Sequence, residues 1–215
     1  MDKYIEALIL YIVLFFAGTA GSIAGGTAQA ADFSVTAEIM RILLYSIPSL
    51  ALIWYLIFKA GRLENSIIRP GKKDLLSGLI TLPCLFIIGF AVIFVSSHIG
   101  GSSAQAPLHN PSTGMGWIVL CISNICAAYL EESYFRYYLL TRRDEFKLNA
   151  ASALMLSTAL FSICHIYEGP WGFLNAALSG TFLGFIFLRY NSLHGIAIAH
   201  GLYNVLVYVL NSVVF

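Results

Sequence analysis

Long apolar stretches separated by short polar joins are the dominant pattern of this chain. A membrane-spanning helix needs about 17–25 mostly apolar residues, and stretches of this length recur throughout the 215 residues. Seven are predicted, at residues 5–24, 39–60, 75–98, 116–141, 148–166, 171–189 and 193–214. The joins between them, such as 61–73 and 100–116, carry Gly, Pro and Ser. The pattern predicts one all-α integral membrane domain over residues 1–215, a transmembrane bundle of about seven spans, within a range of six to eight.

The composition agrees with a membrane location. Hydrophobic residues make up 59% of the chain and charged residues 11%, whereas a soluble domain carries roughly 25% charged residues. Mean hydropathy is +0.80. The net charge is +1, with no basic arm or acidic tail, so nucleic acid is excluded as an expected partner. The lipid bilayer is the expected surroundings.

Two features of the chain bear on processing and on redox state. The first span ends near "AQA" (28–30), which resembles a signal-peptidase site, but Asp2 and Glu6 spoil the positive start that a signal peptide has. Retention of the first span is therefore favoured over its removal. The four cysteines, Cys84, Cys121, Cys126 and Cys164, all lie in predicted spans. That placement argues against a disulfide framework.

Basic residues set the predicted orientation, because cytoplasmic loops are enriched in Lys and Arg. They gather at the joins 59–73 and 142–147, and Arg189 lies near the end of the sixth span, whereas the join 100–116 has no Lys or Arg. The joins that carry the basic residues are therefore expected in the cytoplasm, together with the N-terminus. The short chain and brief loops favour a prokaryotic plasma membrane.

Several polar residues lie inside the apolar spans, where each charge costs about 2.5–3.5 kcal/mol on insertion scales. They are Glu131, Glu132, Arg136, His165, His200 and Asn204. Arg41, by contrast, is near a span end and can extend to the interface. Glu132 and Arg136 are four residues apart, as are His200 and Asn204, and this spacing places each pair on one helix face. An intramembrane ionisable group is by default a candidate functional residue.

The spacing also divides the two glutamates and brings spans together. Glu131 is rotated about 100° from Glu132, so it is expected to face a cavity while Arg136 holds its neighbour. A turn near Leu148 leaves 17 residues back to Glu131 and 17 forward to His165, so these two side chains are expected at similar depth. Phe161, one turn before His165, is expected to wall the site.

Three short motifs in this region resemble those of a known family. "EESYFR" fits EExxxR, "FSICH" fits FxxxH and "HGLYN" fits HxxxN, in that order on successive spans. Over residues 116–210 the chain resembles the CPBP family of intramembrane proteases, which includes CAAX proteases and bacteriocin-processing (Abi) enzymes. The resemblance implies a glutamate-type peptidase with a catalytic core at 116–210 and no metal or other cofactor. Glu131 and His165 would activate water, His200 and Asn204 would stabilise the oxyanion, and Arg136 would pair with Glu132.

The chemistry of amide hydrolysis fits these residues without the family name. Water must lose a proton beside the carbonyl to a group of suitable pKa, and an oxyanion needs donors already in place. Direct attack by water on a membrane-anchored protein or peptide is therefore favoured. The substrate would be a CAAX-type protein, a peptide with a leader or a protein with a C-terminal membrane tail. The pattern does not specify an oligomeric state.

Two other interpretations use the same residues. Glu131, Glu132, His165 and His200 offer the ligand types of a catalytic zinc, although the HExxH motif is absent and Arg136 would weaken metal binding. A membrane scaffold, immunity factor or proton relay would also use Glu and His within a bundle. A further difficulty concerns depth, because His165 is near the outer end of its predicted span and His200 is near the inner start of its own. A tilt or break in the sixth span, with a bend at Gly180 and Gly184, or a shifted span boundary, is expected to reconcile the two.

Overall fold

The computed structural model describes residues 3–16, 33–63, 69–99 and 109–214, and helices are its only regular elements within these ranges. The N-terminal segment consists of α1 (Lys3–Tyr11) and the π-helical turn η1 (Ile12–Phe16). The second span comprises α3 (Val35–Arg41), the π-helical turn η2 (Ile42–Ser46) and α4 (Ile47–Lys59). The third is α6 (Lys72–Ile99). The all-α membrane bundle predicted from the sequence is confirmed.

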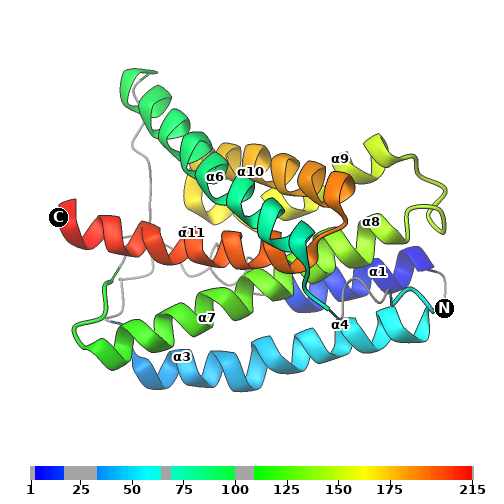
Figure 1. Ribbon diagram of the computed structural model, residues 1–215, viewed down its shortest axis with the longest axis horizontal. Helices are drawn as coiled ribbons and strands as arrows, with labels where there is room; N and C mark the ends of the chain where they lie inside the picture. The colour runs from blue at the N-terminus through cyan, green and yellow to red at the C-terminus, as the bar shows by residue number, and fades with distance from the viewer. Residues whose placement is uncertain (1–2, 17–32, 64–68, 100–108, 215) are drawn as a thin grey trace.

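The C-terminal half supplies the remaining helices. The fourth span comprises α7 (Gly114–Glu132), the π-helical turn η3 (Ser133–Tyr138) and α8 (Leu139–Thr141). It is followed by α9 (Ala150–Ile163), the 3₁₀ turn η4 (Ile166–Glu168), α10 (Gly169–Tyr190) and α11 (Leu193–Val214). In Figure 1, α7 and α11 lie side by side along the long axis, with α3 and α4 beneath α7 and α6 crossing above α11.

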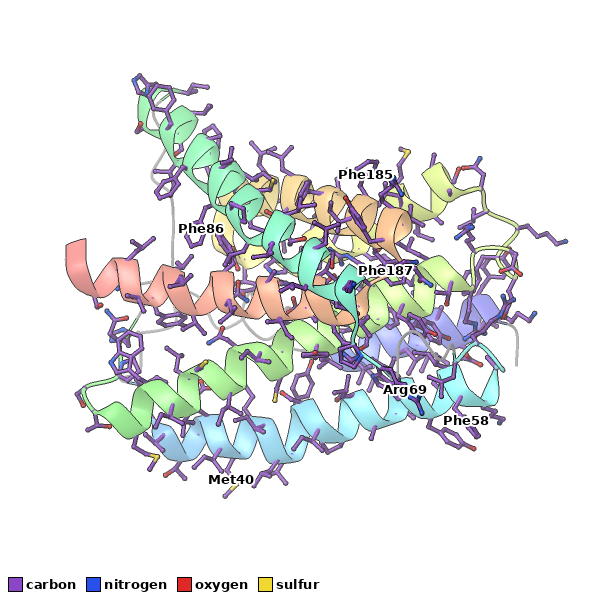
Figure 2. The ribbon with its side chains drawn as sticks, in the orientation of Figure 1. Met40, Phe58, Arg69, Phe86, Phe185 and Phe187 are labelled. Carbon is purple, nitrogen blue, oxygen red and sulfur yellow. The ribbon has the colours of Figure 1, made fainter. Side chains whose placement is uncertain are left out.

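Five of the helices are long and apolar enough to cross a membrane, at residues 35–59, 72–99, 114–141, 166–190 and 193–212. The predicted span 5–24 is helical as far as Phe16, and its remainder lies outside the described residues. The predicted span 148–166 is the shorter helix α9. The outer surface of the bundle carries large apolar side chains such as Met40, Phe58 and Phe185, which point away from the helices (Figure 2). Apolar exposure on this scale suits contact with lipid rather than with water.

Local sequence explains where several helices begin and bend. Three capping side chains, Ser34, Thr113 and Asn149, accept hydrogen bonds from the first turns of α3, α7 and α9, which satisfies backbone donors that a helix start leaves free. Pro48 has no N–H to donate to the carbonyl of Leu44, and the widened turn η2 lies at this place in the helix. The proline therefore shapes the second span without breaking it.

Close packing joins α6 to α11, the helix that carries His200. Gly78 and Gly195 allow the two backbones to approach, since a Cβ at Gly78 would lie 3.2 Å from the carbonyl oxygen of Gly195. Ser192 donates to Asp74 at 2.6 Å and lies 2.7 Å from the Ser77 hydroxyl. Small residues and interhelical hydrogen bonds are the usual basis of helix association in membranes. They fix α11 beside α6 at the end opposite the C-terminus.

Ion pairs connect three segments at the end of the bundle where α4 ends and α9 begins. Arg62 binds Asp144 at 2.8 Å and Glu145 at 3.2 Å, and Arg142 binds Glu6 at 2.8 Å. The hydrogen bond from Arg62 holds the pKa of the Asp144 carboxyl below its ordinary value. These pairs tie the joins after α4 and α8 to the N-terminal helix.

Candidate active site

The centre of the site is a wide turn of helix that is enclosed on all sides. Glu131 and Glu132 end α7, and all six residues of η3 (Ser133–Tyr138) are buried. Helices α4, α9, α10 and α11 all contact this turn. A π-helical turn inside an α-helix is often found at functional sites. The charged residues of this turn therefore face neighbouring helices rather than lipid.

Glu132 is held from both sides. Its side chain is fully buried, with Oε2 3.1 Å from Nε of Arg136 and Oε1 2.9 Å from Nδ1 of His200. The pairing with Arg136 is the one that the spacing predicts, whereas the hydrogen bond to His200 was not predicted. A buried carboxylate needs such partners, because an unpaired charge is costly away from water.

Arg136 in turn contacts three helices. Its Nη2 donates to the carbonyl of Gly180 at 3.3 Å, and its guanidinium carbon lies 4.5 Å from the ring centroid of Phe161. A Cβ at Gly180 would lie 2.8 Å from the Phe161 ring. The absence of a side chain at Gly180 thus lets α10 approach both the arginine and its aromatic neighbour. The interaction of the guanidinium with the ring adds to the pairing.

Glu131 has a different environment from its neighbour. Its side chain is 24% exposed, and Oε2 lies 3.8 Å from Nε2 of His200, which is too long for a hydrogen bond. Tyr45, Tyr167 and Glu168 are within electrostatic range of it. Glu132 is thus bound by its structural partners and Glu131 is partly accessible, as the 100° rotation between adjacent helical residues suggests.

His165 lies at the end of α9, and its own backbone sets its tautomer. Nδ1 is 2.9 Å from the carbonyl oxygen of Phe161, and the two rings are 4.6 Å apart. Because a carbonyl oxygen only accepts, Nδ1 carries the proton and Nε2 of the neutral ring retains its lone pair. The half-buried imidazole is thereby prepared to accept a proton at Nε2.

His200 is also held through its Nδ1 atom, here by a carboxylate rather than by a backbone carbonyl. Its Nδ1 faces the Glu132 carboxylate, which as an anion only accepts, so Nδ1 is again protonated. Its Nε2 points toward Glu131. The ring centroids of His200 and Phe161 are 6.1 Å apart, so the Phe161 ring lies near both imidazoles.

Asn204 is one turn beyond His200 on α11 and is half-buried. Of the predicted site residues, Glu131, Glu132, Arg136, Phe161, His165 and His200 are joined by the contacts above. Among the described contacts none links Asn204 to this group. Only the helical spacing places Asn204 on the same face of α11 as His200.

The depth difficulty is resolved by α9 and not by α10. Helix α9 has 14 residues, about 21 Å of helix, so it cannot cross the roughly 30 Å hydrocarbon core. Its turn into α10 lies well short of the N-terminal end of α7 and the C-terminal end of α11 (Figure 1), so His165 need not lie at the outer surface. The sixth span is not broken, because α10 is continuous from Gly169 to Tyr190. The predicted boundary of the span 148–166 was too long.

Glu168 lies near the site but was not predicted from the sequence. Glu168, three residues after His165, is half-buried and within electrostatic range of His165 and Glu131. The sequence places it in a join between two predicted spans, where a charge is ordinary. The signal that was available is its position directly after the FxxxH motif and before Gly169 and Pro170.

A metal site was the main alternative for these residues. Within the described ranges, no group of three His, Cys, Asp or Glu side chains has a geometry that suits a metal ion. Arg136 and His200 already occupy both oxygens of Glu132.

Comparison with known families places the site in context. The family model of Rce1-like type II CAAX prenyl endopeptidases matches residues 112–206. Over this segment the chain is similar to that family. The Rce1-like segment runs from the start of α7 into α11 and contains all three motifs, so the resemblance to CAAX proteases is confirmed. No curated protein and no solved structure shows significant similarity to the chain. The chain is thus an integral membrane protein, and its residues 112–206 are similar to a peptidase family.

Proposed function

We propose that the chain is an intramembrane endopeptidase of the glutamate type, in which Glu131 and His165 activate a water molecule. The observation that carries the proposal is the division between the two glutamates. Glu132 is bound by Arg136 and His200, whereas Glu131 is partly open beside Nε2 of His200. A general base must be free to accept a proton, and Glu131 has that freedom.

The charges of the site support a division of labour between the histidines. Glu131 and Glu132 carry two negative charges, Arg136 supplies one positive charge, and a protonated His200 would balance the second. In that state Nε2 of His200 is a donor directed toward the reacting region, which suits an oxyanion. Asn204 would add a second donor. His165, whose Nε2 has a lone pair, remains available as an acceptor.

The hydrolysis is balanced in protons and bonds. Water gives a proton to Glu131 or His165 while its oxygen attacks the substrate carbonyl, and the resulting oxyanion is stabilised by His200 and Asn204. When the C–N bond breaks, the stored proton passes to the leaving nitrogen. The products are a carboxylic acid and an amine, and the residues return to their first state.

The proposed substrate is a membrane-anchored protein or peptide. The family name indicates CAAX-type processing of a prenylated C-terminus, and removal of a leader or of a C-terminal membrane tail uses the same chemistry. The catalytic core is proposed to be residues 116–210.

Cleavage by the purified protein tests the proposal. Membrane-anchored peptides of the three classes are incubated with wild type and His165→Ala, each with and without a zinc chelator, and the products are identified by mass. We expect cleavage that survives the chelator and falls by about 10²–10⁴ in His165→Ala, the usual contribution of general acid–base catalysis. His98→Ala, at the exposed end of α6, is the matched control.

Two results would contradict the proposed mechanism. Activity that is lost to the chelator and restored by zinc would make the same residues metal ligands. Failure to cleave any peptide class would favour a scaffold, immunity or proton-relay role.

The proposed orientation places the N-terminus and the ion pairs of Arg62 and Arg142 in the cytoplasm of a prokaryotic cell. The concentration of basic residues at this end supports it. We expect a single cysteine introduced at Lys147 to resist labelling by a membrane-impermeant reagent in intact cells and one at Gly114 to react, in a background without native cysteines. The reverse pattern would invert the orientation.

A further inference from the structure

Glu168 lies beside the proposed site and is folded along the start of α10. Its backbone N–H donates to the carbonyl of His165 at 3.0 Å, which anchors the residue to the catalytic histidine. A Cβ at Gly172 would lie 2.3 Å from Cβ and 2.9 Å from Oε2 of Glu168. Only glycine at this position leaves the carboxylate room to lie over the first turn of the helix.

Asn175 continues the same face of α10, because residues 168, 172 and 175 follow helical spacing. Its amide hydrogen-bonds to the hydroxyl of Tyr203 on α11, and Tyr203 is within electrostatic range of Glu168. The Oδ1 atom of Asn175 is buried and has no donor among the described residues. Gly89 of α6 admits the Tyr203 hydroxyl, which would lie 2.6 Å from a Cβ at that position. The Asn175 amide and the Tyr203 hydroxyl thus meet between α6, α10 and α11, and the Glu168 carboxylate is within electrostatic range of that hydroxyl.

The charge balance of this region is negative. Arg136 is paired with Glu132, and among the described residues no Lys or Arg lies within ion-pair distance of Glu168. Tyr167 is its hydrogen-bond partner, and His165 and Glu131 are within electrostatic range of its carboxylate. Away from bulk water such a field attracts a cation strongly. An ammonium or guanidinium group would also supply the donor that Oδ1 of Asn175 lacks.

We propose that Glu168, Asn175 and Tyr203 form a subsite for a basic side chain of the substrate and thereby determine specificity. The proposal rests on the proposed peptidase function and adds a substrate class to it, membrane-anchored sequences with a Lys or Arg close to the scissile bond. Glu168 supplies the opposite charge, and Asn175 and Tyr203 supply neutral acceptors. Glu131 and His165 remain the reacting groups.

Binding to an inactive protein tests the subsite without relying on turnover. The probes are fluorescent membrane-anchored peptides that carry Lys, norleucine or Glu, scanned through the segment next to the anchor. Their affinities are measured by anisotropy for Glu131→Gln and for the same protein with Glu168→Gln or Glu168→Lys. We expect Lys at one position to bind about tenfold tighter than norleucine, the scale of one charge-assisted hydrogen bond. That ratio should fall to about one in Glu168→Gln and reverse in favour of Glu in Glu168→Lys.

Two further variants separate specificity from folding. Glu38→Gln removes a carboxylate that is already bound by Arg41 and Ser123 on another face, so the ratio should not change. Asn175→Asp adds a second carboxylate and should raise the preference for Lys. Equal binding of the Lys and norleucine peptides at every position, or a preference that survives Glu168→Gln, would overturn the subsite. Absence of cleavage by wild type would instead count against the peptidase proposal, because the binding ratio is measured independently of turnover.

Discussion

The Glu131→Gln protein is expected to fold normally and to lose peptide cleavage, with kcat reduced by about 10²–10⁴ or more. Glutamine keeps the shape of the side chain but cannot take a proton from water. The partners of Glu132 are not touched by the change, because Arg136 and His200 contact the neighbouring carboxylate. Removal of one of two adjacent negative charges should leave the thermal midpoint equal to or above that of wild type. Product formation and thermal unfolding in the same detergent measure both effects.

Glu131→Asp provides a graded companion to this variant. It keeps the carboxylate but withdraws it by one methylene, so activity should be intermediate while stability is retained. Glu38→Gln is the matched carboxylate control on α3, outside the catalytic group, and should cleave at the wild-type rate. Full activity of Glu131→Gln would remove this residue from the mechanism and would leave His165 as the sole candidate base.

Local spacing predicted those parts of the site that lie on one helix. The pairing of Glu132 with Arg136 follows from four residues of separation, and the different environment of Glu131 follows from the rotation between neighbours. The contact of His200 with Glu132 joins residues 68 apart in sequence. It depends on how α11 packs against η3, which no periodicity encodes. Helical spacing therefore paired His200 only with Asn204, and its direct bond to Glu132 was not predicted.

Hydropathy predicts where an apolar run ends, but it does not predict a helix end that lies inside such a run. The apolar run continues through Cys164 and Ile166, so a hydropathy pattern reads α9 as a full span. The helix is followed by the 3₁₀ turn Ile166–Glu168 and by Gly169, which adopts φ 81° and precedes a proline. Glycine accepts this backbone conformation at little cost. The early end of α9 thus comes from backbone conformation and not from polarity.

Arg136→Ala is expected to destabilise the protein by about 3–5 kcal/mol, the usual cost of breaking a buried ion pair by removing one partner. The guanidinium is fully buried between Glu132, the carbonyl of Gly180 and the ring of Phe161. Its removal leaves the Glu132 carboxylate with His200 as its remaining partner and opens a cavity beside Phe161. Cleavage should be lost as well, since His200 would be drawn more tightly to Glu132 and away from the reacting region. Denaturant or thermal unfolding in detergent gives the stability, and the peptide assay gives the activity.

Two comparisons distinguish a buried pair from a general effect of losing an arginine. Arg41→Ala breaks the ion pair between Arg41 and Glu38. The Arg41 side chain is 44% exposed, so this substitution should lower the stability by less than about 1 kcal/mol. The double variant Glu132→Leu with Arg136→Met replaces the pair by apolar groups of similar size and should regain much of the lost stability but no activity. Normal stability of Arg136→Ala would show that the pair is not structural. Recovery of stability without activity in the double variant would mean that the charges of Glu132 and Arg136 serve to orient His200. A packed apolar core can hold the helices together, but it cannot present Nε2 of His200 to a developing oxyanion.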